Sequence, residues 1–490
     1  MRYLTPFLRR LIPIIVLSAV FILGSGCAKR PKPAELPETL PEGWSVQQRA
    51  AASLPDQTTD QAVLQPKPKQ IEIAALTMTA SLLDLLNDPS ITGLVKEALA
   101  NNPDLKATAA RLRASGFLLS QTGSGRLPEI SAGADRGRDN RSLDDAGKPD
   151  ARNAYQISAS ISWELDVWGR ITDLHQAQLL EHDALGMKYI QAYDALAARV
   201  IQAWISAVAT LQTHRIEEER LAALIKIEDA LMLRYREGLG SLEDYAASRT
   251  RTEVARANVS ARTETHHRAL RTLEVLAGRY PRAEQLTSDT LPEIKTSPVP
   301  PPEAALKNRP DIRAALARVD AGRLTALDAE KNRLPALRLV TEVSKASTSF
   351  SNLDTASRIW SLAAGLTQPV FQGGRLKDEA MAREAEAEAA VYSLAQTVLS
   401  AMKEVEDTLE NETALALQES ALATATREAA KTTAYFRTRY RNGLDNIQTL
   451  LIAQEQEMNI KTSLTDIRAA RITNRIDMAL ALGLGMGLGV

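Results

Sequence analysis

Histidines, paired carboxylates and a glycine-rich segment are the parts of this sequence that could carry chemistry, and none has the spacing that the chemistry requires. His266 and His267 are adjacent, so they do not present two metal ligands on one helical face. Glu164 and Asp166 lie two residues apart in an extended segment, which does not by itself make an acid and base pair. The glycine-rich segment LGLGMGLGV precedes no helix that could bind a phosphate. These patterns predict neither an enzyme nor a metal site.

Cys27 is the residue with the most specific chemical interpretation, as a lipid attachment site. Three arginines precede an apolar run at residues 11–23, and small residues separate that run from the cysteine. This layout predicts a signal peptide at residues 1–26. The alternative, an uncleaved anchor, is disfavoured because the run covers only about 20 Å of a ~30 Å hydrocarbon core.

As the only cysteine, Cys27 has no internal disulfide partner, and its position resembles the lipobox of bacterial lipoproteins. We expect a covalent lipid on Cys27 rather than a free thiol, and no other cofactor.

The overall composition favours a large, mainly helical protein. The chain has 490 residues, of which 24% are charged, with abundant alanine and little phenylalanine. This composition suits long, closely packed helices. A formal charge of −1 and a pI near 6.6 provide no basic field for binding nucleic acid. Residues 27–80 are rich in Pro, Gln and Thr and have little apolar periodicity, so we expect a lipid-anchored, extended tether there.

The chain contains a tandem duplication. Pro103 in NNPDL recurs as Pro310 in NRPDI, an offset of 310 − 103 = 207 residues. Further along, Gly238 recurs as Gly443, an offset of 443 − 238 = 205 residues. The unit is far longer than the 20–50 residues of solenoid repeats. We therefore expect a first repeat at residues 81–280, a Pro-rich linker at 281–303, a second repeat at 304–484 and a short tail at 485–490.

Each repeat contains segments that alternate between apolar and small polar residues, as β-strands do. Residues 154–165 place Trp163 on one face and serines on the other, and residues 357–368 repeat the pattern with Trp360. Weaker alternation predicts partner strands at residues 130–138 and 337–345. Such ribbons could pack on a soluble core or face lipid in an outer-membrane barrel. Because the smallest bacterial barrels need about eight strands, four per chain would close only if several chains pooled them.

Two long helices follow the strands in each repeat. Residues 169–237 contain no proline, so this helix could extend for nearly 70 residues and about 100 Å. Apolar and small residues recur at seven-residue steps, Ala197 and Trp204 among them, which predicts coiled-coil contacts. A lone coiled-coil stalk is the alternative interpretation, and it would leave the inserted strands unexplained.

A sharp interruption divides the helical pattern in both repeats, in RYREGLGSLEDY and in RYRNGLDNIQTL. Gly238 and Gly443 can end a helix in the left-handed conformation. Each copy should therefore form a tight helical hairpin, with Leu239 and Leu444 exposed at its apex.

The second helix of each hairpin has an expected start. Ser241 followed by Asp244 predicts the N-cap of the helix in the first repeat. In the second repeat, Asp445 followed by Gln448 predicts the same cap. The two hairpins should thus be built alike.

Together these segments resemble the TolC-like outer-membrane efflux proteins, particularly the lipoprotein branch that serves resistance-nodulation-division pumps. The resemblance covers about residues 81–483, and its motifs are SWELDVWGRI, QPVFQGGRL, NRPDIRAA, RLPALRL and the two hairpins. It implies a homotrimer in which twelve strands form an outer-membrane β-barrel and twelve helices form a periplasmic α-barrel. It also implies two protein partners, a periplasmic adaptor and an inner-membrane pump.

The resemblance assigns roles to two groups of residues. Adaptor docking falls on the hairpins, at Arg234, Tyr235, Gly238, Leu239, Arg439, Tyr440, Gly443 and Leu444; for the glycines, helix capping without partner contact is the alternative. The sharp turns from strand to long helix fall on Gly169, Arg170, Gly373, Gly374 and Arg375. Glycine tolerates such turns, whereas the two arginines are either solvated charges near the membrane surface or specific structural pairs.

The pore constriction departs from the family pattern. Relatives often have LLDAQ after the second hairpin, and their Asp forms a ring that narrows the pore and selects cations. Here the sequence is LLIAQ, so Ile452 occupies that position and Gln448 lies one turn earlier. An acidic gate would have to use Asp445, Glu243 or Asp244, each of which could instead be a helix cap. Cation selectivity is therefore not transferred to this chain.

We expect a passive exit duct of a tripartite efflux pump, lipid-anchored in the bacterial outer membrane with a periplasmic extension. The alternatives are the exit duct of a metal-ion efflux or type I protein-secretion system, and a lipid-anchored coiled-coil scaffold without a pore.

Overall fold

The computed structural model describes residues 34, 41, 43–47, 88–143, 149–286, 288–293 and 299–485. The expected signal peptide at residues 1–26, Cys27, most of the tether at residues 27–80 and residues 486–490 of the expected tail lie outside the described residues. Within the tether, Trp44 is buried, and its indole N–H donates to the carbonyl of Pro300 at 2.8 Å.

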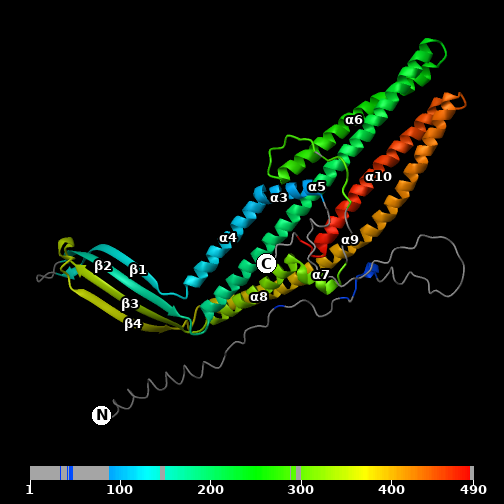
Figure 1. Ribbon diagram of the computed structural model, residues 1–490. Coiled ribbons are helices and arrows are strands. Elements are labelled where there is room, and N and C mark those ends of the chain that lie inside the picture. The colour runs from blue at the N-terminus through cyan, green and yellow to red at the C-terminus, as the bar shows by residue number, and fades with distance from the viewer. Residues whose placement is uncertain are drawn as a thin grey trace, which may run out of the picture. The chain divides into compact units, whose positions relative to one another are not determined.

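Among the described residues, each repeat consists of two helices, two strands and two long helices (Figure 1). In the first repeat these are α3 (Pro89–Asn101), α4 (Pro103–Ser124), β1 (Glu129–Leu143), β2 (Pro149–Leu165), α5 (Arg170–Arg236) and α6 (Leu242–Leu276). In the second they are α7 (Pro302–Asn308), α8 (Pro310–Lys331), β3 (Ala336–Ser347), β4 (Arg358–Thr367), α9 (Arg375–Arg441) and α10 (Ile447–Ala481), with the short 3-10 helix η2 (Phe350–Asn352) between the strands. The tandem duplication is confirmed, and the fold is mainly α with one small sheet.

The region ahead of the strands differs from the expectation of one helix, because it holds two. Pro103 begins α4 and Pro310 begins α8. Proline is tolerated in the first turn of a helix, where its missing N–H has no partner to lose, but it would break a helix interior. The helix therefore ends and restarts at each proline.

The long helices are confirmed. α5 and α9 have 67 residues each, or about 100 Å at 1.5 Å per residue, and α6 and α10 have 35 each. α5 is long and apolar enough to cross a membrane, but 67% of its most apolar stretch is buried by the protein itself. That burial is typical of a core helix.

The four strands form one antiparallel sheet in the order β1-β2-β3-β4 (Figure 1). They coincide with the four predicted segments, and β1 and β2 extend further than predicted. Within the described residues, β1 and β4 are edge strands whose outer edges have no partner.

The chain divides into two compact units. One contains Ser115–Asp183 and Leu316–Tyr392, and therefore the whole sheet. The other contains Ala184–Ala315 and the chain from Ser393 onward. The largest core of the second unit is built on α5, where Ala197, Val200 and Trp204 are buried against Val95 of α3 and Ile476 of α10. The seven-residue spacing of Ala197 and Trp204 did identify this buried stripe.

Each repeat is closed by the same joint between its first and last helices. In the first repeat the Asn102 side-chain amide donates to the carbonyl of Leu276 at 3.0 Å. In the second, Arg309 donates to the carbonyl of Ala481 at 3.0 Å. A Cβ on Gly278, beside the first joint, would lie 2.9 Å from the Asn101 carbonyl oxygen, so the approach needs glycine. These bonds also satisfy carbonyls that a helix end leaves without partners.

Candidate functional site

Both helical hairpins end their first helix with the same hydrogen-bond pattern. In the first hairpin the N–H of Leu239 donates to the carbonyl of Arg234 at 2.8 Å, and that of Gly238 donates to Tyr235 at 3.0 Å. Gly238 has φ +74°. This pair of bonds around a left-handed glycine is the Schellman motif.

The second hairpin repeats the motif one repeat later. The N–H of Leu444 donates to the carbonyl of Arg439 at 2.9 Å, and that of Gly443 donates to Tyr440 at 3.0 Å. Gly443 has φ +71°. Both glycines thus have a capping role, whatever partner the hairpins bind.

The starts of the second helices confirm one predicted cap and correct the other. Ser241 caps α6, and its hydroxyl accepts from the N–H of Asp244 at 3.0 Å. α10 is capped by Asn446, which accepts from the N–H of Thr449 at 3.0 Å. The prediction of Asp445 as this cap, with Gln448 three residues on, is wrong.

Asp445 instead pairs with Arg439, at the end of α9. The same arginine donates to the carbonyl of Leu444 at 3.2 Å and lies over the ring of Tyr435, 5.6 Å from its centroid. The hydrogen bond to Asp445 raises the pKa of the Arg439 guanidinium above its ordinary value. The carboxylate therefore faces a cation within its own hairpin.

The tips expose apolar side chains above a shared core. Leu239 and Leu444 are 67% and 61% exposed. Below them, Leu231 of α5 packs with Leu450 and Leu451 of α10 in one buried cluster. This cluster joins the two hairpins of the chain.

Equivalent residues of the two tips have different surroundings. Tyr235 is exposed and its ring stacks on Tyr245, with centroids 6.2 Å apart and planes 7° apart. Its counterpart Tyr440 packs against the cluster that joins the hairpins. The backbone is duplicated, but the side-chain contacts are not.

The remaining gate candidates lie near the tips, on α6 and α10. Gln448 accepts a hydrogen bond from Arg251 of α6 at 3.2 Å, which links the two hairpins. Ile452 is 58% exposed. Glu243 is exposed and Asp244 is half-buried, both in the first turn of α6. The structure thus brings Gln448 into a contact between hairpins and leaves Ile452 uncovered.

The turn from β2 to α5 contains a capping residue, Asp166, that the sequence patterns did not identify as a cap. Gly169 has φ +73°. Ile171 and Thr172 follow this glycine, and their N–H groups donate to the Asp166 carboxylate at 2.9 and 2.8 Å. The Thr172 hydroxyl donates to the same carboxylate at 2.6 Å. Burial raises the pKa of the Asp166 carboxyl, but these hydrogen bonds outweigh burial and hold it below its ordinary value.

Arg170 is a specific structural pair rather than a solvated charge. It donates to Glu164 at 2.8 Å and to Asp328 of α8 at 3.3 Å. Close by, Lys331 of α8 forms an ion pair with Asp173 of α5, which is 1% exposed. These contacts join the first repeat to the second.

The equivalent turn from β4 to α9 has no such partners in the described chain. Gly373 and Gly374 both have positive φ, +60° and +88°. Arg375 is 64% exposed and contacts only Glu379, at 3.4 Å, and Gln372. The two predicted arginines therefore differ: Arg170 is built into a contact between repeats and Arg375 is solvated.

One face of the sheet is mainly apolar, and the other is mainly small and polar. Because Ile130 pairs with Ile161 and Ile161 pairs with Thr341, residues of one side line up across the strands. The mainly apolar side carries Ile130, Ala132, Ile157, Ile161, Trp163, Leu337, Leu339, Val343, Trp360, Leu362 and Leu366. It also carries Thr341 and, near the hairpin ends of the strands, the cations Arg136, Lys345 and Arg358. The other side carries mainly small residues, namely Ser131, Gly133, Ser158, Ser160, Ser162, Ser344, Ser361, Ala363 and Gly365. It also carries the charged residues Asp135, Glu164, Arg338 and Glu342 and the apolar residues Val340 and Ile359.

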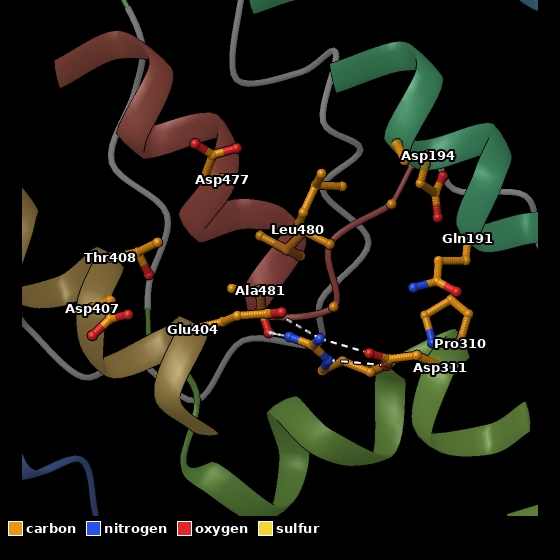
Figure 2. Close-up of a pocket in the computed structure, with 15 residues that line it drawn as sticks. Gln191, Asp194, Pro310, Asp311, Glu404, Asp407, Thr408, Asp477, Leu480 and Ala481 are labelled. Atoms are coloured by element: carbon orange, nitrogen blue, oxygen red, sulfur yellow. Dashed lines mark hydrogen bonds and ion pairs between the residues drawn. The ribbon is translucent and has the colours of Figure 1, made fainter. Parts of the chain in front are cut away.

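A cavity of about 420 Å³ lies in the second unit, between α5, α8, α9 and α10. Figure 2 shows Asp311, Glu404 and Ala481 turned toward one guanidinium on its wall, that of Arg309. Arg309 donates to Asp311 and to Glu404, each at 2.7 Å. Its partners come from three helices, so the cavity lies beside a joint that holds the helices together. Asp311 is two residues from Arg309, but Glu404 and Ala481 are 95 and 172 residues away, so no sequence pattern indicated this cluster.

The chain matches the protein-family model described as outer membrane efflux protein over residues 94–279 and 302–484. It is 27% identical to the outer membrane protein OprJ of Pseudomonas aeruginosa, covering 80% of this chain and 83% of that one. It is 27% identical to the toluene efflux pump outer membrane protein TtgF of Pseudomonas putida, over 89% and 90% of the two chains. It is 25% identical to the cation efflux system protein CusC of Escherichia coli, over 80% and 86%.

Solved structures share the fold. A membrane protein from Pseudomonas aeruginosa superposes with a TM-score of 0.80 at 24% identity, covering 92% of this chain and 99% of that one. The CmeC outer membrane channel of Campylobacter jejuni has a TM-score of 0.81 at 18% identity, covering 89% and 96%. The family model spans both repeats, and the chain therefore belongs to the outer membrane efflux protein family, whose members are non-enzymatic ducts that span the outer membrane and extend into the periplasm.

Proposed function

We propose that three copies of the chain close into one passive duct, through which an inner-membrane pump and a periplasmic adaptor expel small molecules. The chain itself needs no energy source. It supplies a continuous lumen and an end that can open.

The faces of the sheet carry this proposal. Four strands cannot close a barrel, and both outer edges of this sheet are unpaired within the described residues. One face is mainly apolar from β1 to β4, with its charged residues near the hairpin ends of the strands, and the other bears mainly small and polar residues. A shared barrel would turn the apolar face to lipid and the small polar face to a water-filled lumen.

The hairpin tips suit docking of an adaptor. Leu239 and Leu444 each extend from a rigid Schellman motif, and exposed apolar side chains on a fixed backbone are typical of interaction sites. The motif holds the leucines in place without a partner, so docking would not have to order the loop. A lipid on Cys27 would add a second attachment to the outer membrane.

The exported compound is proposed as a small organic molecule of low polarity. Relatives that the chain matches over most of their length include a toluene efflux protein, and Ile452 at the expected constriction is apolar. The second candidate cargo is a cation, because the chain also matches a cation efflux protein. Transport assays with each cargo in cells carrying the cognate pump distinguish the two.

Conductance in planar lipid bilayers tests the duct. We expect stepwise conductance from the purified protein, and more frequent openings from Leu451→Ala, because this change weakens the cluster that joins the hairpins. Leu417→Ala, at an exposed position of α9, is the matched control and should behave as the wild type. If neither the wild type nor Leu451→Ala conducts, the scaffold without a pore becomes the better interpretation.

A further inference from the structure

A second cavity, of about 180 Å³, lies below the hairpin tips, where α5, α6 and α10 meet. Its wall includes Leu224 of α5, Arg251 of α6 and Leu451 of α10. Leu451 belongs to the buried cluster that joins the hairpins, and Leu224 packs against that cluster. Both hairpins therefore enclose the cavity, and it keeps its shape only while they stay joined.

Arg251 is a half-buried cation on this wall that no anion balances. Its guanidinium donates through Nη2 to the neutral side chain of Gln448 at 3.2 Å, whereas its Nη1 is buried and no described residue accepts from it. The ion pairs of the neighbouring arginines, Arg220 with Glu217 and Arg256 with Glu253, do not include it. A partly buried charge without an opposite charge, and a buried donor without an acceptor, both cost free energy. The wall thus lacks one negative charge.

The other charges on the wall are already balanced or solvated. Arg220 donates to Asn459 at 2.6 Å and lies 3.5 Å from the carboxylate of Glu217, although no described residue accepts from its Nε. Glu455 is also on the wall, but it is exposed, and water and salt screen an exposed carboxylate. Arg251 is therefore the charge that a ligand would neutralise.

The rest of the wall is mainly apolar, and its size suits one aromatic ring. The apolar residues are Ala223, Leu224, Val254, Ala255, Leu451 and Met458. An apolar protein cavity of about 150 Å³ holds benzene, so this cavity can hold a ring with one small substituent. A methionine sulfur also makes favourable contacts with aromatic rings. Phosphate fits this wall poorly, because it would exchange its hydration for apolar side chains.

We propose that this cavity binds a small aromatic monocarboxylate of the size of benzoate, with the carboxylate on Arg251 and the ring among Leu224, Leu451 and Met458. The ligand supplies the negative charge that the wall lacks and fills the apolar part of the cavity. Several bonds of the arginine side chain rotate, so a small shift turns its unpaired N–H groups to the carboxylate.

The bound ligand acts as a clamp between the hairpins, and this step rests on the proposed function. It contacts α6 of the first hairpin and α10 of the second. Separation of the hairpins removes one wall of the cavity, so the ligand binds the joined arrangement in preference. At a ligand concentration ten times its Kd, the joined arrangement is favoured by about a further tenfold. Openings of the duct should become rarer by the same factor.

Equilibrium dialysis of the purified oligomer against labelled benzoate, with detergent alone subtracted, tests the site. Benzamide, which lacks the charge, and acetate, which lacks the ring, should each compete at least tenfold more weakly. Arg251→Gln should weaken benzoate binding at least tenfold, and Arg251→Lys, which keeps the charge, should retain most of it. Arg249→Gln, at an exposed position of α6 outside the wall, is the matched control and should bind as the wild type does.

Two binding results would overturn the proposal while leaving the duct intact. The first is no saturable binding by an oligomer that conducts. A bridging water would then be the better partner for Arg251 and for the side-chain oxygen of Gln454, which is buried on the same wall without a described donor. The second is equal binding of benzoate and benzamide, because the charge of Arg251 would then play no part.

Bilayer recordings test the clamp. Benzoate at ten times its Kd should make openings of the wild type about tenfold rarer. The same concentration should leave the openings of Arg251→Gln as they are without benzoate. Unchanged openings of a wild type that is saturated with benzoate would overturn the clamp. Saturable binding that depends on Arg251, in a protein that never conducts, would support the site and count against the duct.

Discussion

Asp166 fixes the point at which β2 ends and α5 begins. Its carboxylate accepts three hydrogen bonds from Ile171 and Thr172, which satisfies two N–H groups in the first turn of α5. In the sequence Asp166 stands out only as a neighbour of Glu164. The capping role depends on the backbone turn at Gly169, which brings residues five and six positions later back onto the carboxylate.

Buried His266 makes stability depend on pH. Burial lowers its pKa from 6.5, although a hydrogen bond with Gln285 opposes this; Thr210, His214 and His267 are also close. The unfolded chain therefore takes up a proton at higher pH than the folded chain does, so stability falls as the pH falls below 6.5. The midpoint temperature of thermal unfolding should be lower at about pH 5.5 than at about pH 8, and His266→Gln should reduce this difference. His267→Gln is the control, and an unchanged difference in His266→Gln would refute the assignment.

Three glycines should respond differently to replacement by alanine. Gly238→Ala should destabilise the fold by about 1 kcal/mol, because its φ is positive although nothing lies near a new Cβ. Gly278→Ala should cost more, since the same strain is joined by a contact at 2.9 Å. Gly186→Ala, within α5, should be neutral or stabilise by about 0.5–1 kcal/mol. Chemical denaturation measures all three, and equal losses would show that the backbone conformation is not the cause.

At the scale of elements, periodicity and turn residues were sufficient to predict the strands, the long helices and the hairpins. The cap of α10 was not predicted, because Asp445 and Asn446 are both good caps and adjacent. The choice between them is made by Arg439, which pairs with Asp445. Adding the 205-residue offset to Ser241, the cap of α6, gives Asn446. The duplication therefore indicated the observed cap of α10.

The hairpins should bind an adaptor through their apical leucines. Leu239→Glu combined with Leu444→Glu should weaken adaptor binding at least tenfold, because it places charge at the centre of an apolar contact. Helical content should stay unchanged, since both side chains are exposed. Leu233→Glu and Leu417→Glu, at exposed positions below the tips, form the matched control in the same binding assay. Equal loss in both pairs would argue against docking at the apex.

Across the whole molecule, the contacts between repeats were beyond sequence reasoning. Arg170 and Asp328 are 158 residues apart in the chain, as are Asp173 and Lys331. In the sequence each of these four residues is indistinguishable from an ordinary surface charge, because its partner is distant in the chain. By contrast, the alternation of the strands is local, so the two faces of the sheet were predictable.

The face that meets lipid can be identified by two adjacent substitutions in β2. Ile161→Lys, on the apolar face, should reduce the assembled protein in outer-membrane fractions, because a lysine facing the bilayer midplane costs about 2–4 kcal/mol. Ser160→Lys, on the polar face, should assemble normally and alter the conductance. Quantitative immunoblotting of membrane fractions and bilayer recording check the pair. The reverse pattern would mean that the face carrying Ser160, and not the face carrying Ile161, meets lipid.

The first strand hairpin is longer than the second, and this has an immunological consequence. β2 starts at Pro149, but its pairing with β3 ends at Tyr155 opposite Ser347, so residues 149–154 continue about 20 Å beyond it at ~3.3 Å per residue. In a closed barrel of several chains, each copy would contribute one such ribbon, and these ribbons would project beyond the rest of the barrel rim. Antibodies and bacteriophages approaching the cell from outside would meet them first, which makes them the natural place for an inserted epitope tag.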